Sequence, residues 1–128
     1  MSIHGLRIGL DGHLEELVLP ADPADLATAL NTALDSRVFD LVRFDGDLDL
    51  FVDDEGIYTS QPNPVMSIVA RWLGCEQSLL FGPGVFLRGD PRTGDSLSLT
   101  TDQQRLIART HESVLRTGRL AALLRGAP

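Results

Sequence analysis

A dense group of carboxylates in the middle of the chain is the first candidate for chemistry. Between residues 40 and 55 the only basic side chain is Arg43, whereas seven residues are acidic: Asp40, Asp45, Asp47, Asp49, Asp53, Asp54 and Glu55. Clustered carboxylate oxygens are the ligands that hard divalent cations prefer. The calcium-loop pattern, however, needs Asp-x-Asp-x-Asp-Gly before a final glutamate, and here Gly46 precedes most of the acids.

Three interpretations of these acids stay open. Apolar side chains alternate with Asp49, Phe51 and Asp53, which is typical of a strand with one packed face and one solvated face. Acids on a solvated face also oppose unwanted strand pairing, and we expect this structural role first. The second interpretation is a surface that binds another protein, in one form by imitating the phosphates of DNA to inhibit a host nuclease or defence protein. A metal site is the third.

A stripe of arginines near the C-terminus is the second candidate. Arg109, Arg116 and Arg119 follow Arg105 by 4, 11 and 14 positions, with Glu112 between them. On a helix these side chains fall within about 40° of one line. Such a face binds nucleic acid or an acidic partner, or it has a purely structural role. The structural role is either the ordinary solvated side of an amphipathic helix or a stripe that pairs with the chain's own acids. We expect a structural role.

Charge limits the class of partner. The net charge is −7, and every basic residue is an arginine. Residues 1–100 carry six arginines against sixteen acids, a balance of −10, whereas residues 101–128 carry five against two, a balance of +3. A chain this acidic is a poor general binder of DNA phosphates. We therefore expect another protein as the partner, bound by charge complementarity through the acidic stretch or the arginine stripe, and no direct nucleic-acid binding.

Known catalytic signatures are missing from the sequence. There is no lysine and hence no phosphate-binding P-loop, and no G-x-S-x-G motif. Cys75 follows a predicted helix C-terminus, where the helix dipole disfavours a thiolate. We assign no catalytic, cofactor-binding or metal-ligating residue and expect a non-enzymatic interaction protein. The alternative is a small-molecule binder or enzyme with a pocket near Asn63, Trp72 and Gly82.

A single α+β domain over residues 1–128 must position these side chains. Asp11-Gly12 and Asp45-Gly46 each separate two apolar runs, which predicts two antiparallel hairpins. Asp22-Pro23 and Asn63-Pro64 are cap-then-proline signals, and they predict helices over residues 23–35 and 64–73. We expect two layers, with both helices on one face of the sheet and the side of the second helix that carries Trp72 buried against it.

The second half of the chain adds shorter strands and a long helix. Residues 57–59, 79–81, 85–88 and 96–99 are strand-like, and Thr101 with Gln104 fits a capping box that opens a C-terminal helix. The segment 100–128 docks, protrudes or dimerises. Gly118 is a potential break, and the apolar run Leu120–Leu124 is a potential homodimer contact.

No stretch approaches the roughly 18 apolar residues of a membrane span. We identify no signal peptide, and the single cysteine fits a reducing compartment. We therefore expect a cytoplasmic protein with no membrane contact.

Several short motifs resemble, in order, a family of small phage- and plasmid-associated bacterial domains of unknown function. The resemblance spans roughly residues 24–105, and the arginine-rich end and the Asn63-Pro64 pair depart from it. It implies an α+β domain, common on mobile elements, with no assigned activity and no catalytic residues to transfer. The matching features are a helix before a hairpin (26–34, then 38–52), Asp54-Glu55-Gly56, Pro62-Asn63, a strand between Gly82 and Gly89, and Leu99-Thr100-Thr101-Asp102.

Overall fold

The structure is a computed structural model that describes residues 1–77 and 79–124, without the side chains of residues 120–124. It is an α+β fold around one antiparallel sheet, as the sequence predicts. The sheet order is β2-β1-β5-β4-β3, and β6 pairs with the end of β5. The elements are β1 (Ser2–Ile8), β2 (Leu14–Pro20), α1 (Pro23–Leu34), β3 (Phe39–Phe44), β4 (Leu48–Asp53), α2 (Gly56–Thr59), α3 (Pro64–Trp72), β5 (Gly84–Gly89), β6 (Ser96–Leu97) and α4 (Thr101–Leu124).

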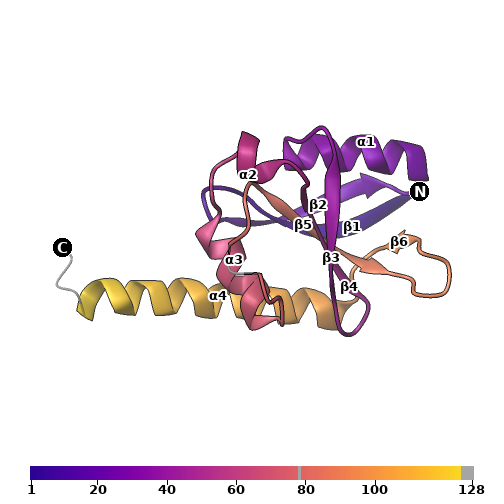
Figure 1. Cartoon of the computed structure of the whole chain (residues 1–128). Coiled ribbons are helices and arrows are strands. Elements are labelled where there is room, and N and C mark those ends of the chain that lie inside the picture. Colours follow the sequence, from indigo (N-terminus) through magenta and orange to yellow (C-terminus); the bar gives the residue numbers. More distant parts are fainter. Residues whose placement is uncertain (78, 125–128) are drawn as a thin grey trace.

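Helices cover both faces of the sheet, so the expected two layers are wrong and there are three. One face carries Phe86 and Leu50 and packs on α3 and α4, whereas the other carries Leu87 and Phe51 and packs on α1. Figure 1 shows α1 and α4 on opposite sides of the strands. The reason is visible in β4 and β5, where the neighbouring pairs Leu50–Phe51 and Phe86–Leu87 each place one apolar side chain on either face, so each face needs its own cover.

The connections of the β1–β2 and β3–β4 hairpins differ from each other. Residues 9–13 connect β1 to β2, and within them Gly12 has a positive φ of 82° whereas Asp11 does not. Residues 45–47 connect β3 to β4, and there Gly46 and Asp47 both have positive φ, 77° and 61°. Because a type I′ turn needs two consecutive positive φ values, the first connection is a longer loop rather than that turn.

Side-chain caps begin the three longer helices. Asp22 Oδ1 accepts hydrogen bonds from the amides of Ala24 (3.0 Å) and Asp25 (3.2 Å), as predicted for α1. The capping box of α4 lies one residue earlier than expected: Thr100 Oγ1 accepts from the Gln103 amide at 3.0 Å, and Gln103 Oε1 accepts from the Thr100 amide at 2.9 Å. Gln103 Nε2 also donates to the Gly46 carbonyl at 3.0 Å, which ties the start of α4 to the β3–β4 turn.

Four local predictions need correction. Trp72 is 50% exposed, because α3 packs through Met66, Val69 and Ala70 instead. Residues 57–59 belong to the short helix α2, not to a strand. Residues 79–81 form only an isolated bridge, between Phe81 and Pro62. Helix α4 continues through Gly118 without a break.

Candidate interaction surfaces

The acidic hairpin, defined as Asp45, Asp47, Asp49, Asp53, Asp54 and Glu55, is divided by the fold. Asp49 and Asp53 are only 7% and 9% exposed, whereas Asp45, Asp47 and Asp54 are exposed. The expectation of a solvated face on this strand is therefore wrong. Strand β4 lies between β3 and β5, and both of its faces are covered, so its alternating acids are enclosed with Phe51.

Asp53 and Glu55 have structural partners. Asp53 Oδ1 accepts a hydrogen bond from the Glu55 amide at 2.9 Å, and its Oδ2 accepts one from the Thr59 hydroxyl at 3.1 Å. The Glu55 carboxylate binds the Arg37 guanidinium at 2.8 Å. These contacts hold the short helix α2 against the end of β4, so two of the six predicted residues already serve the fold.

Asp49 lies in a small hollow of about 90 Å³ beneath the β5–β6 connection, which Asp47 and Asp90 also line. A Cβ atom at Gly89 would collide with its carboxylate, so the enclosure depends on that glycine. Burial raises the pKa of Asp49; Arg43, with Nε 3.9 Å from Oδ1, opposes this effect, and Asp47 reinforces it. In the described part of the chain, no three His, Cys, Asp or Glu side chains are placed to hold a metal ion.

The arginine face, defined as Arg105, Arg109, Arg116 and Arg119, is exposed along α4. Arg116 pairs with Glu112 at 2.8 Å. Arg105 shares a shallow hollow with Glu15 and Glu16 but forms no ion pair with a described residue. Arg109 and Arg119 form no ion pair with a described residue either. Of the two structural roles expected for this stripe, pairing with the chain's own acids is thus found only for Arg116.

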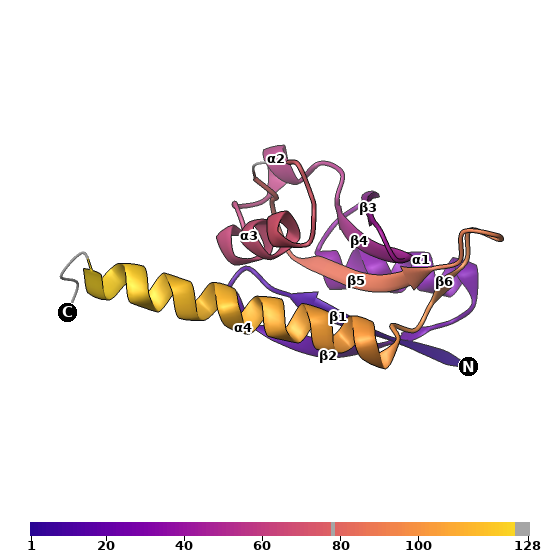
Figure 2. The same cartoon turned by 90° about the horizontal axis from the view of Figure 1, so that it is seen from below.

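Helix α4 is anchored through its first half. Ile107 and Val114 are buried against the sheet, and His111 Nε2 lies 2.7 Å from the carbonyl oxygen of Gly12. The helix has 24 residues, which corresponds to about 36 Å, and Figure 2 shows its C-terminal part extending past the rest of the molecule. The protrusion that the sequence left open is therefore present, whereas the side chains of the Leu120–Leu124 homodimer prediction lie outside the described residues.

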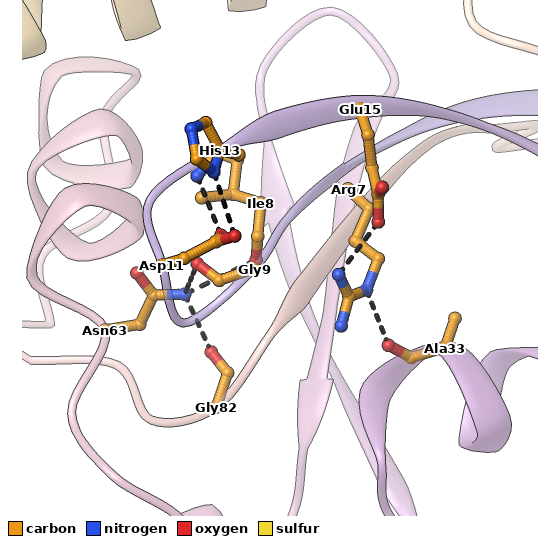
Figure 3. A network of polar contacts seen from close by, with 9 residues as sticks. All are labelled: Arg7, Ile8, Gly9, Asp11, His13, Glu15, Ala33, Asn63 and Gly82. Carbon is orange, nitrogen blue, oxygen red and sulfur yellow. Dashed lines mark hydrogen bonds and ion pairs between the residues drawn. The ribbon is translucent and has the colours of Figure 1, made fainter.

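The Asn63 side chain, near which the sequence suggested a pocket, makes several hydrogen bonds to the backbone. It is completely buried, and its Nδ2 donates to the carbonyls of Gly9 and Gly82, both at 3.0 Å, and more weakly to that of Ile8 at 3.4 Å. Its Oδ1 caps α3 by accepting from the Met66 amide at 3.2 Å. Figure 3 shows Asn63 joining the β1–β2 connection to the segment before β5, so its amide is used by the backbone.

Figure 3 also shows a second polar contact of the β1–β2 hairpin, made by Arg7 to the end of α1. Arg7 Nε donates to the carbonyl of Ala33, near the end of α1, at 2.8 Å, and its Nη1 contacts Glu15 at 2.8 Å. At the hairpin tip, the exposed Asp11 and His13 pair at 2.9 Å, which lowers the pKa of Asp11 and raises that of His13. All of these contacts hold the hairpin in place.

Two hollows escaped the sequence reasoning because their walls come from distant segments. One, of about 440 Å³, lies beneath α1 and is mainly apolar, with Ile3, Leu26, Leu30 and Phe51 in its wall. The other, of about 250 Å³, lies beside β3 and α2 and is lined by apolar and acidic side chains, among them Asp40, Val42, Asp54, Ile57 and Leu79. For the second hollow, the apolar residues of α2 are the one signal in the sequence that could have suggested it.

Comparisons with known proteins give a family but no activity. No helix among residues 1–77 and 79–124 is both long and apolar enough to span a membrane. Comparisons with curated proteins and with solved structures found no match. The family model of a domain of unknown function, DUF3846, matches residues 13–112. This match includes the edge strands, α3 and the anchored half of α4, and the chain therefore belongs to the DUF3846 family.

Proposed function

We propose that this protein is a non-enzymatic interaction domain, which binds an acidic surface of another protein through the arginine face of α4. The observation that carries this proposal is that Arg105, Arg109 and Arg119 lie along one line of α4, are exposed and form no ion pair with a described residue. Outside α4, Arg7, Arg37, Arg43 and Arg92 each form an ion pair within 4.0 Å. Arg71 and Arg88 form none among the described residues, but they lie apart on α3 and β5. Arg109 and Arg119 have no such partner among the described residues, although the chain is acidic overall.

The position of the arginine face supports the same proposal. The half of α4 that carries Arg116 and Arg119 extends beyond the sheet (Figure 2), so a partner reaches it without displacing other elements. Glu112 lies within the stripe, which suits a partner surface of mixed charge better than a row of phosphates. Complementary charge of this kind mainly accelerates encounter and selects the partner.

A charge-reversal experiment tests this proposal. The double variant Arg109→Glu/Arg119→Glu is compared with Arg71→Glu/Arg92→Glu, which changes the net charge equally at exposed arginines outside α4. The probes are a labelled polyglutamate peptide and a 20-base-pair DNA duplex, measured by fluorescence anisotropy at two salt concentrations. We expect the peptide to bind the wild type and the control, and the α4 variant to lose about tenfold or more in affinity.

Two outcomes would contradict the proposal. Equal binding by both double variants would show that the arginine face is not the contact. Tighter binding of the duplex than of the peptide, lost in the α4 variant, would make nucleic acid the partner. The expected setting, an accessory role on a bacterial phage or plasmid, is supported by the family resemblance alone.

The inhibitor that imitates DNA has weaker support. Asp45 and Asp47 lie at the β3–β4 turn and Asp54 beyond the other end of β4, roughly 20 Å away along an extended strand. The acids between them are enclosed. The exposed carboxylates therefore lie at two separate places instead of in a continuous row. Charge reversal at Asp45 and Asp47 would test the first place, and charge reversal at Asp54 the second.

A second candidate function is the binding of a small apolar molecule beneath α1. The 440 Å³ hollow lined by Ile3, Leu26, Leu30 and Phe51 is within the size range of ligand sites. Ala27 also lines it and is half-buried, so Ala27→Trp should fill the hollow. Thermal stabilisation by an apolar fluorescent probe such as N-phenylnaphthylamine, lost in Ala27→Trp, would support this function over the interaction domain.

A further inference from the structure

We propose that the free edge of β3 binds an extended segment of a partner protein by strand addition, and that this segment carries apolar and basic side chains. Strand β3 is the last strand of the sheet and pairs only with β4. In Figure 2 nothing lies beyond it on its outer side. An unpaired edge presents backbone donors and acceptors to an incoming strand. This surface is separate from the arginine face of α4.

The hydrogen-bond phase shows which groups point outward. The Asp54 amide donates to the Val38 carbonyl at 2.9 Å, so residue 38 directs its backbone toward β4. Direction alternates along an antiparallel strand, hence the backbone groups of Phe39, Leu41 and Arg43 point away from β4. No described residue is hydrogen-bonded to the amides of Phe39 and Arg43 or to the three carbonyls.

The Leu41 amide is the outward backbone group that does have a hydrogen-bond partner. Its contact is the reason why we expect the edge to prefer a basic segment. Asp40 Oδ1 accepts its hydrogen bond at 2.8 Å, and Asp40 is exposed. An anionic or neutral segment would have to displace the Asp40 carboxylate from the Leu41 amide. Such a segment would offer that carboxylate no cationic partner in exchange. A basic side chain on the incoming strand pairs with Asp40 and releases the Leu41 amide for a backbone bond. The edge is thus closed to most strands and open to a cationic one.

The hollow beside β3 supplies the apolar part of the contact. Asp40 and Val42 project on the same face of the strand, and both line the 250 Å³ hollow with Ile57 and Leu79. Ile57 and Leu79 are 63% and 43% exposed, so they present apolar surface beside the edge of β3. The charged residues lining this hollow are Asp40, Asp53 and Asp54, all acidic. A basic and an apolar side chain two positions apart would fit it.

A second copy of this chain fits the edge less well. Asp40 and Arg43 are an odd number of residues apart on β3, so their side chains project from opposite faces of the sheet. In an antiparallel pairing between two β3 strands, the same face of each strand lies on the same side of the sheet, so neither residue meets its opposite charge on the other copy. The charge of this edge therefore calls for a different protein, whose segment brings its own basic residues.

The test uses a capped seven-residue peptide of threonines with arginine, valine and arginine at its second, fourth and sixth positions. Binding is followed by NMR through the backbone amides of residues 39–43 of the full chain. Two peptides are controls: one with glutamates in place of the arginines, and one N-methylated on alternate residues so that it cannot donate to the strand. We expect shifts confined to β3, α2 and residues 79–81, and at least about tenfold weaker binding by either control.

Protein variants separate charge from backbone pairing. Asp40→Asn removes one charge and keeps an acceptor for the Leu41 amide, so the preference for the arginine peptide over the glutamate peptide should become smaller. Arg43→Pro removes an outward amide without touching the bonds to β4, and should weaken binding more than Arg43→Ala does. Both effects should persist in Arg109→Glu/Arg119→Glu, which makes this proposal independent of the arginine face.

Three results would overturn strand addition. The first is equal binding by the N-methylated peptide, and the second is shifts located elsewhere or absent. The third is a wild-type dimer in sedimentation experiments that Arg43→Pro dissociates, because the occupant of the edge would then be a second copy of this chain.

Discussion

The acids of β4 and the arginines of α4 are similar in sequence but have opposite fates in the fold. Both sets are charged residues at regular spacing beside apolar ones. The fold encloses Asp49 and Asp53, whereas it leaves Arg109 and Arg119 exposed and without ion pairs among the described residues. Periodicity therefore shows which residues share a face, but not whether another element covers that face.

The difference arises from what lies opposite each charged face. Strand β4 is interior to the sheet and its acids share a face with Phe51, which packs on α1. The arginines of helix α4 are exposed, because its buried side is the opposite one, marked by Ile107 and Val114. Charge on an interior strand has to be accommodated by hydrogen bonds, whereas charge on an outer helix is free for a partner.

The largest expected effect is that of the most deeply buried polar side chain. Asn63→Ala removes a side chain whose amide joins the β1–β2 connection, the segment before β5 and the start of α3. Several buried backbone groups then lose their partner, and we expect unfolding to become easier by about 3 kcal/mol or more. Urea unfolding followed by circular dichroism measures this, and a loss below about 1 kcal/mol would show that water replaces the amide.

Asp53→Ala tests whether an enclosed acid of β4 is structural. The variant removes the acceptor for the Glu55 amide and the Thr59 hydroxyl. We expect a loss of about 2 kcal/mol, with hydrogen exchange accelerated mainly in α2. Asp54→Ala, at the exposed neighbouring position, is the control. Similar losses in both variants would contradict the distinction between enclosed and exposed acids.

Asp49→Asn should increase the stability of the fold at neutral pH, whereas the two preceding substitutions decrease it. Burial raises the pKa of Asp49 in the native state, so the native state binds its proton more readily than the unfolded state. The free energy of unfolding therefore falls as pH rises from the usual carboxyl pKa through the raised pKa of Asp49. We expect Asp49→Asn to gain about 1 kcal/mol over wild type at pH 7, and the gain to disappear toward acidic pH.

Urea unfolding of wild type and Asp49→Asn across pH 3–7 checks that sign. Asp45→Asn, at an exposed turn position, is the matched control and should change stability by no more than about 0.5 kcal/mol at any pH. If Asp49→Asn instead became less stable as pH rose, the contact with Arg43 would outweigh burial.

The smallest expected effect on stability is at the arginine face. Arg109→Ala and Arg119→Ala remove exposed side chains that form no ion pair with described residues, so each should change the free energy of unfolding by less than about 0.5 kcal/mol. Thermal unfolding measures this. A loss above 1 kcal/mol would show that the stripe answers the chain's own acids after all, and would remove the main support for a partner.

Local features could be predicted from the sequence because neighbouring residues produce them. The caps Asp22 and Asn63, the prolines after them, and the period of the apolar residues place α1 and α3 within a residue or two of where they occur. The α+β class with an antiparallel sheet followed from the same local signals, and so did the single line of arginines on α4. Such features depend on backbone geometry over a few residues, which no distant segment had to decide.

Only the tertiary structure decided which surfaces are available. Strand order placed β4 inside the sheet and β3 at its margin, and covering both faces required helices on both sides. The burial of Asp49 and Asp53, the exposure of Trp72 and the hollow beside β3 all follow from that arrangement. The physical reason is that burial is a property of contacts between distant segments, and one alternating sequence pattern is compatible with either side of a strand being covered.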